Sequence, residues 1–314
     1  MNDTRKITEG ALMTGTYLLL LLIILFTPPF LGPLFLVILP VPYVFYSYRH
    51  GWKSGLLMLA VAVIIPLLFA PVLSLFTLIS GIGGLFIGGA MFNKRNSYET
   101  LAMGSIGFIF SLVSVFVISQ VLLGINWSEE IRLTFDDAFD TAQSMMNAFG
   151  GGAGPEEELT ALQEQMASLP DYLPSVLAMV GIVYAFIAQW LSYKVINRVE
   201  GKKFHFPHFR HFNLPISVLW YYFFALIFTF VFAESNNIWY LAAINVFTLA
   251  GAFLVLQGFA FIFYYTHVKD KSKALPILAI VGSILFPTIL LYLVRILGII
   301  DLGFSLRDRL QTKK

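Results

Sequence analysis

The chain has 314 residues, of which 58% are hydrophobic and only 12% are charged, and its mean hydropathy is +0.80. Soluble domains carry roughly 25% charged residues, so this composition excludes a water-soluble globular protein and indicates an integral membrane protein. The net charge of +2 does not favour nucleic acid as a partner. The sequence has no cysteine, which excludes disulfides, thiol catalysis and thiolate metal sites.

A membrane-spanning helix needs about 20 mostly apolar residues. By this measure the sequence predicts an all-α, polytopic helical bundle of about nine transmembrane helices, with an amphipathic helical hairpin outside the membrane. The first apolar run is not followed by a small-residue cleavage site, so we interpret it as a retained helix and not a secretory signal. The predicted spans are residues 11–28, 32–48, 53–71, 73–92, 98–124, 173–196, 213–233, 238–266 and 275–299.

Prolines interrupt two of the early spans. Pro40 and Pro42 lie near the middle of the second span, which we expect to be kinked or broken, and Pro66 lies in the third. Broken helices persist at membrane depth only where protein or a wet cavity satisfies the freed backbone groups. We therefore consider these three prolines candidate cavity walls. The alternative is an ordinary proline kink packed against neighbouring helices.

The fourth span is rich in glycine, including Gly81, Gly84 and Gly88. Phe86 occupies the last position of a G-x-G-x-x-G pattern, so the phosphate-binding fingerprint is incomplete. Gly84-xxx-Gly88 instead leaves one helix face without side chains, and another helix can approach it closely. We expect this span to be the most buried one. The sequence leaves open whether the partner helix belongs to the same chain.

Residues 125–172 form the one long polar stretch. Ile131, Phe135 and Phe139 recur every four residues, and a second amphipathic helix is predicted from Pro155 onward. The acids of this stretch can suggest a metal site. They flank the apolar stripe with no His nearby, so we interpret them as a solvated face and predict no metal site and no cofactor.

A basic loop follows the sixth span, and its cations alternate with Phe. Such a pattern is typical of an anchor on an anionic membrane surface. Three His spaced by three also suit a metal, but Pro207 breaks the helix that this spacing requires. In the last span, Arg295 can reach water at the membrane surface or pair with Glu234. The predicted surface anchor consists of Lys202, Lys203, His205, His208, Arg210 and His211.

Charge predicts the orientation of the spans. With nine spans, fourteen flanking Lys and Arg fall on one side, whereas residues 126–172 contain one Arg and ten acids. Because cytoplasmic loops carry the excess of Lys and Arg, we expect a bacterial plasma-membrane protein with its N-terminus inside. Residues 125–172 and the C-terminus are then outside. The basic tail beginning at Arg307 opposes this placement, and an eight-span chain with a re-entrant second or third segment would remove the conflict.

These features define three predicted parts: residues 1–124 with five spans, residues 125–172, and residues 173–314 with four spans. The proline-rich and glycine-rich spans, together with Leu297–Asp301 and Arg307, resemble a bacterial family of YybS-like predicted membrane proteins. More distantly, the first six spans look similar to the substrate-binding subunits of energy-coupling-factor vitamin transporters.

The transporter similarity implies a six-helix domain with a ligand pocket that opens to the outside. It also implies that a small-xxx-small pair on the first helix, matched by Ala11 and Gly15, docks on a membrane-protein partner. The three further spans and the acidic stretch depart from that family.

The sequence shows no nucleophile–base pair, metal-ligand spacing or paired intramembrane acids, so we do not expect an enzyme. We expect a protein that contacts membrane lipid and binds a small or lipid-like ligand in an outward-facing cavity, as a component of an uptake system. The alternative is a non-transporting scaffold that recruits envelope-related partners. A sizeable polar-lined pocket among spans two to six favours ligand binding, whereas a solid helix pack favours the scaffold.

Overall fold

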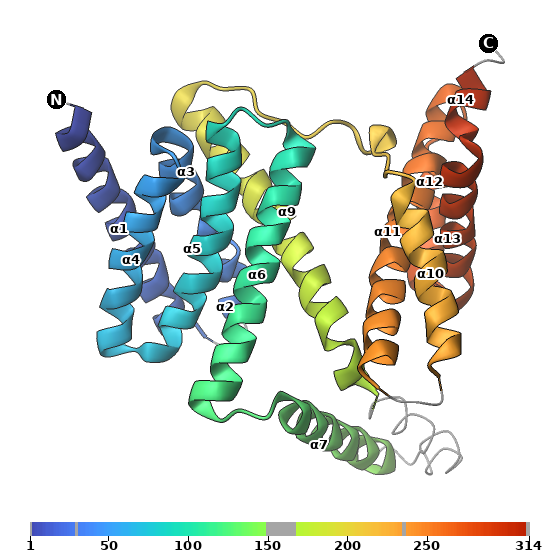
Figure 1. The fold of residues 1–314 in the computed structure, drawn as a ribbon, viewed down its shortest axis with the longest axis horizontal. Helices are drawn as coiled ribbons and strands as arrows, with labels where there is room; N and C mark the ends of the chain where they lie inside the picture. The colour runs from blue at the N-terminus through green and yellow to red at the C-terminus, as the bar shows by residue number, and fades with distance from the viewer. Residues whose placement is uncertain (1, 29–30, 149–167, 234–236, 312–314) are drawn as a thin grey trace. The chain divides into compact units, whose positions relative to one another are not determined.

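The computed structural model describes residues 2–28, 31–148, 168–233 and 237–311, and every regular element in these ranges is helical (Figure 1). The all-α class predicted from the sequence is therefore confirmed. The chain divides into two compact units, which we call the N-terminal unit (Met1–Phe206) and the C-terminal unit (Pro207–Lys314).

The described residues of the N-terminal unit form six helices that cross it, one amphipathic helix and two short turns of helix. Their bounds are α1 (Asn2–Phe26), α2 (Gly32–Leu36), α3 (Pro40–His50), α4 (Trp52–Phe69), α5 (Pro71–Phe92), α6 (Ser97–Leu123), α7 (Trp127–Ala148), η1 (Leu169–Tyr172) and α9 (Leu173–Glu200).

Helix α5 packs against α3, α4 and α6. Of its most apolar 18 residues 61% are buried, the largest share among the candidate spans of the described residues, which confirms the prediction made from its glycines. Gly84 and Gly88 face α3. A Cβ on Gly84 would lie 2.9 Å from the carbonyl oxygen of Pro40, and a Cβ on Gly88 would lie 2.6 Å from that of Val44. The helix that approaches these two glycines thus belongs to the same chain.

The second predicted span is broken, as its prolines suggested. Helix α2 ends at Leu36, and α3 begins at Pro40 after a short turn. Because proline has no backbone N–H, it suits the start of a helix better than its interior. Pro66 behaves differently, since it lies inside a continuous α4.

Helix α9 packs against α3 and α6, and it therefore belongs to the N-terminal unit. The sequence prediction had grouped residues 173–196 with the later spans, because the polar stretch 125–172 separates them from the first five. Helix α9 therefore packs with helices that precede the polar stretch, and this stretch does not mark the boundary between the two units.

Ion pairs join α1, α3 and α9 at one end of the N-terminal unit, which we call its basic end. Arg49, near the end of α3, pairs with Glu9 on α1 at 3.2 Å and with Glu200 at the end of α9. His50 Nε2 lies 2.8 Å from the same Glu9 carboxylate. Ser97, which begins α6, donates a hydrogen bond to the carbonyl of His205. Helix α7 follows the other end of α6 and so lies opposite the basic end (Figure 1).

Helix α7 has the predicted amphipathic pattern. Ile131, Phe135 and Phe139 are half-buried, whereas Asp136 and Asp137 are exposed. Residues 149–167, which include the glycines and most of the second helix of the predicted hairpin, lie outside the described residues.

In the C-terminal unit, α11 and α13 pack most closely. Gly258 faces the carbonyl of Val294, and Gly298 faces the carbonyl of Leu254. The elements of this unit are η2 (Phe209–His211), α10 (Ser217–Val231), α11 (Ile238–Val268), α12 (Ala274–Leu285), α13 (Pro287–Phe304) and α14 (Leu306–Gln311).

The predicted ninth span, residues 275–299, is wrong. Phe286 leaves the helical conformation, and Pro287 begins a separate helix. Helices α11 and α13 run in the same direction, so α12 crosses back between them. The C-terminal α14 therefore lies at the same end of this unit as η2, and the predicted placement of the C-terminus opposite the basic loop is corrected. The parallel direction follows from the pairing of positions 254, 257 and 264 with positions 298, 301 and 307.

The number of spans also differs from the prediction of nine. Seven helices of the described residues are long and apolar enough to cross a membrane, and α10 and α12 are shorter apolar helices. The short helices and the broken second span explain the difference, because windows of apolar residues do not reveal where a helix stops.

Candidate functional site

A groove of about 680 Å³ runs over α5 between α4 and α6, and we call it the α4–α6 groove. Its walls are apolar and include Leu56 of α4, Phe86 of α5 and Met103 of α6. Gly89 and Ala90 line it where α5 passes beneath. These two small residues leave the space that a larger side chain on α5 would fill.

The charged and amide side chains of the α4–α6 groove gather where α5 gives way to α6. They are Asn93, Arg95 and Glu99. Arg95 and Glu99 lie 3.5 Å apart and are 62% and 48% exposed, so the pair is open to solvent. Asn96 caps α6 by accepting a hydrogen bond from the backbone N–H of Glu99 at 2.9 Å. The groove thus has an apolar body and one polar rim, at the basic end.

A second groove of about 670 Å³ lies between α1 and α4, and we call it the α1–α4 groove. Ala11 and Gly15, the predicted docking pair, line it and are exposed. A Cβ on Gly15 would meet no atom within 4 Å. Helix α1 therefore presents a small-residue face that its described neighbours do not fill.

The predicted cavity-wall prolines line neither of these two grooves. Pro40, Pro42 and Pro66 are buried in α3 and α4. The helices pack closely near them: the Tyr43 ring is fully buried, and a Cβ on Gly81 would lie 3.3 Å from it. All three prolines are thus packed against neighbouring helices, as the alternative interpretation expected.

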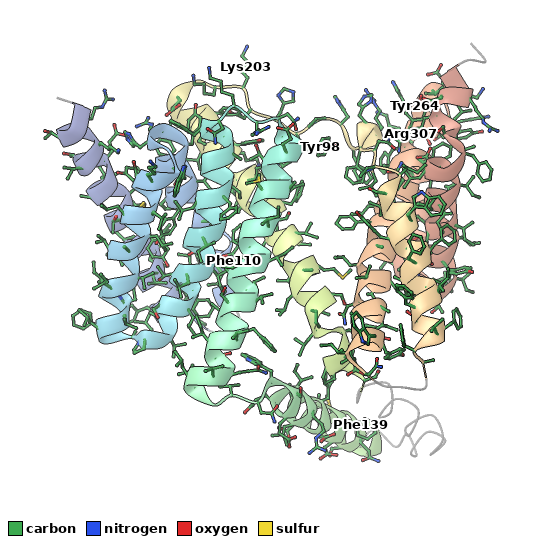
Figure 2. All side chains as sticks on the ribbon, viewed as in Figure 1. Tyr98, Phe110, Phe139, Lys203, Tyr264 and Arg307 are labelled. Carbon is green, nitrogen blue, oxygen red and sulfur yellow. The ribbon has the colours of Figure 1, made fainter. Side chains whose placement is uncertain are left out.

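In the first half of the loop that carries the predicted surface anchor, the basic side chains are exposed and the Phe side chains are half-buried. In the N-terminal unit, Lys202, Lys203 and His205 are exposed, and Lys203 projects away from the helices (Figure 2). Phe204 turns inward and stacks on Tyr193 with ring centroids 5.3 Å apart. This alternation leaves the cations of the loop free to meet a charged surface.

The remaining anchor residues belong to the C-terminal unit. His208 and His211 are exposed, and Arg210 is half-buried. Slight burial and the neighbouring cation of Arg210 lower the pKa of His211 below its usual value. At pH 7 this imidazole is therefore neutral, and Arg210 carries the local positive charge.

A buried polar cluster joins α11, α13 and α14 at the end of the C-terminal unit where η2 lies. Asp301 and Gln257 are 3% and 0% exposed. Gln257 Nε2 donates to Asp301 Oδ2 at 2.6 Å, and Arg307 Nε donates to the same oxygen at 3.0 Å. Gln257 Oε1 also accepts from the backbone N–H of Leu214 at 3.0 Å. Arg307 lies beside Tyr264 (Figure 2) and donates to the carbonyl of Arg210.

Sequence reasoning missed this cluster. Asp301 was noted only as part of a family resemblance, Arg307 only for that resemblance and as the start of the basic tail, and Gln257 was not singled out. The signal was the position of a lone acid in the last turns of an apolar helix, where a charge needs a partner.

The predicted ion pair between Glu234 and Arg295 falls partly outside the described residues, because Glu234 is not among them. Arg295 lies in the middle of α13. Its Nε is buried and has no hydrogen-bond partner in the described part of the chain. Within the same residues, no group of three His, Asp or Glu side chains is placed to hold a metal ion.

A model of the family described as predicted membrane protein (DUF2232) matches residues 16–302. The chain is also 27% identical over 321 residues to the uncharacterized protein YybS of Bacillus subtilis (strain 168), across 99% of this chain and 100% of that protein. No solved structure matches, so the distant similarity to transporter subunits stays a prediction. The predicted YybS-like resemblance is confirmed: the chain belongs to the DUF2232 family of predicted membrane proteins.

Proposed function

We propose that this chain is a non-enzymatic, multi-pass membrane protein that binds a lipid-like ligand in the α4–α6 groove. The observation that supports the proposal is the groove itself, with about 680 Å³ of space, apolar walls and polar side chains confined to one rim. Ligand sites in proteins typically measure about 300–1,000 Å³ and combine an apolar lining with a few polar groups. This layout suits a molecule with an apolar chain and a polar head.

The orientation of the ligand follows from the rim. Arg95 remains accessible beside Glu99, so an anionic or zwitterionic head can bind there while the chain lies against Leu56, Phe86 and Met103. We propose that the protein resides in the bacterial plasma membrane with its basic end in the cytoplasm. The rim then faces the cytoplasmic leaflet, and this site replaces the outward-facing cavity expected from the sequence.

The reversal at Phe286 supports this orientation. It brings Arg307 to the same end of the C-terminal unit as Arg210, so the basic tail no longer opposes the charge rule. Helix α7, with its exposed acids, is then placed outside the cytoplasm.

Photolabelling with a diazirine-tagged fatty acid tests the ligand site. In the wild-type protein we expect label on peptides from α4, α5 and α6. Ala102→Phe places an aromatic ring in the groove from an exposed position and should remove most of this label. Ile106→Phe, one turn further along α6 and 55% exposed, is the matched control and should not. Equal labelling of the two variants would refute the proposal.

A second candidate function is that of a subunit that docks on another membrane protein through α1. The specific observation is the open space beside Gly15 in the α1–α4 groove. Small residues let helix backbones approach closely in membranes. Replacing both Ala11 and Gly15 with Leu should leave the chain folded but abolish co-purification of a partner. A loss of thermal stability without loss of a partner would argue against docking.

A further inference from the structure

Arg295 is a cation at membrane depth in the C-terminal unit. It is the ninth residue of the 18-residue α13, so it lies about 12–14 Å from either end at 1.5 Å per residue. It follows Ile289 and Tyr292 at three-residue spacing, and these side chains are 66% and 59% exposed. Arg295 itself is only partly exposed, and its guanidinium lies beside Gly251 of α11, next to this exposed apolar stripe.

The surroundings of Arg295 make room for its guanidinium, and no ion pair joins it to an acid within the described part of the chain. A Cβ on Gly251 of α11 would lie 3.2 Å from Arg295 Cζ, so the guanidinium packs closely against this glycine. Arg295 Nε is buried without a hydrogen-bond partner among the described residues. The one acid of α13, Asp301, already accepts hydrogen bonds from Arg307 and Gln257.

Ionisable side chains within a membrane are costly unless they pair, and they mark sites where ligands or ions bind. Arginine is suited to oxyanions, because its planar guanidinium donates two parallel hydrogen bonds to a carboxylate or a phosphate. We propose that Arg295 binds the carboxylate or phosphate of an amphiphilic ligand at the surface of α11 and α13. The apolar stripe of α13 then contacts the chain of that ligand.

This site is independent of the α4–α6 groove, and its test is arranged to keep the two apart. Full-length protein carrying Ala102→Phe, which closes the groove, is titrated in detergent with phosphatidylglycerol or with diacylglycerol, which lacks the phosphate, and binding is followed by native mass spectrometry. We expect a preference for phosphatidylglycerol of about tenfold, the effect of one charge-assisted contact. Inorganic phosphate is titrated in parallel, and binding of phosphate alone would identify a free anion, and not a lipid headgroup, as the ligand of Arg295.

Arg295→Gln should abolish the preference, Arg295→Lys should retain part of it, and the exposed control Arg309→Gln should retain all of it. Without anionic ligand, Arg295→Gln should melt at the same or a higher temperature than the parent, because it removes an unpaired charge. An unchanged preference in Arg295→Gln would overturn the proposal. So would a lower melting temperature shared by Arg295→Gln and Glu234→Gln, which would identify an internal ion pair instead.

Discussion

Adding one methyl group at Gly88 tests the packing of the N-terminal unit. In Gly88→Ala the new Cβ would lie 2.6 Å from the Val44 carbonyl oxygen, 2.6 Å from Ser47 Cβ and 3.0 Å from the Tyr48 backbone nitrogen. Carbon atoms pack best at about 3.5–4.0 Å, so α3 must move by roughly 1 Å. Two of these three atoms belong to the backbone of α3 and cannot rotate away.

The cost of such overpacking is typically about 1–3 kcal/mol. Alanine recovers about 0.5–1 kcal/mol of helix propensity over glycine, so we expect a net loss of roughly 1–2 kcal/mol. For a unit of this size, 1 kcal/mol corresponds to about 2–4 °C in the melting temperature. Gly88→Leu should be more severe.

Gly15→Ala is the matched control, because its Cβ would meet no atom within 4 Å. Its helix propensity gain should raise the melting temperature slightly or leave it unchanged. Thermal unfolding of both variants in the same detergent measures the difference. If Gly88→Ala melts no lower than Gly15→Ala, the close contact between α3 and α5 is wrong.

Three further predictions concern other parts of the chain. Asp301→Asn leaves Arg307 buried without its charge partner and should cost about 3–5 kcal/mol, whereas the exposed Arg309→Gln should stay within about 0.5 kcal/mol in the same melting assay; equal stabilities would contradict the buried cluster. In intact cells, Gly152→Cys should react with an impermeant maleimide and Gly201→Cys should not, and the reverse pattern would overturn the orientation. Lys314→Cys should be protected as Gly201→Cys is, and labelling there would contradict the reversal at Phe286.

The fold class, the central place of α5 and the break at Pro40 could be predicted, because composition, glycine spacing and proline chemistry act locally. The division into units could not, since α9 joins α3 and α6 through side chains distant in sequence. The reversal at Phe286–Pro287 was missed for another reason. Residues 275–299 are apolar throughout, and a hydropathy window does not distinguish one span from two shorter helices.

The candidate site shows the same contrast. Ala11 and Gly15 were found from a local pattern, and the structure shows them exposed in the α1–α4 groove. The α4–α6 groove combines residues from three helices and had no sequence signature. The prolines did not predict its position, because a proline indicates where a helix breaks and gives no information on the space beside it.

Native mass spectrometry of the protein purified gently from its membrane tests the central claim most directly. The account predicts one bound amphiphile in the wild type and in Ile106→Phe, and its loss in Ala102→Phe. Retention of the same bound amphiphile by Ala102→Phe, or no bound amphiphile in any of the three proteins, would contradict a ligand in the α4–α6 groove.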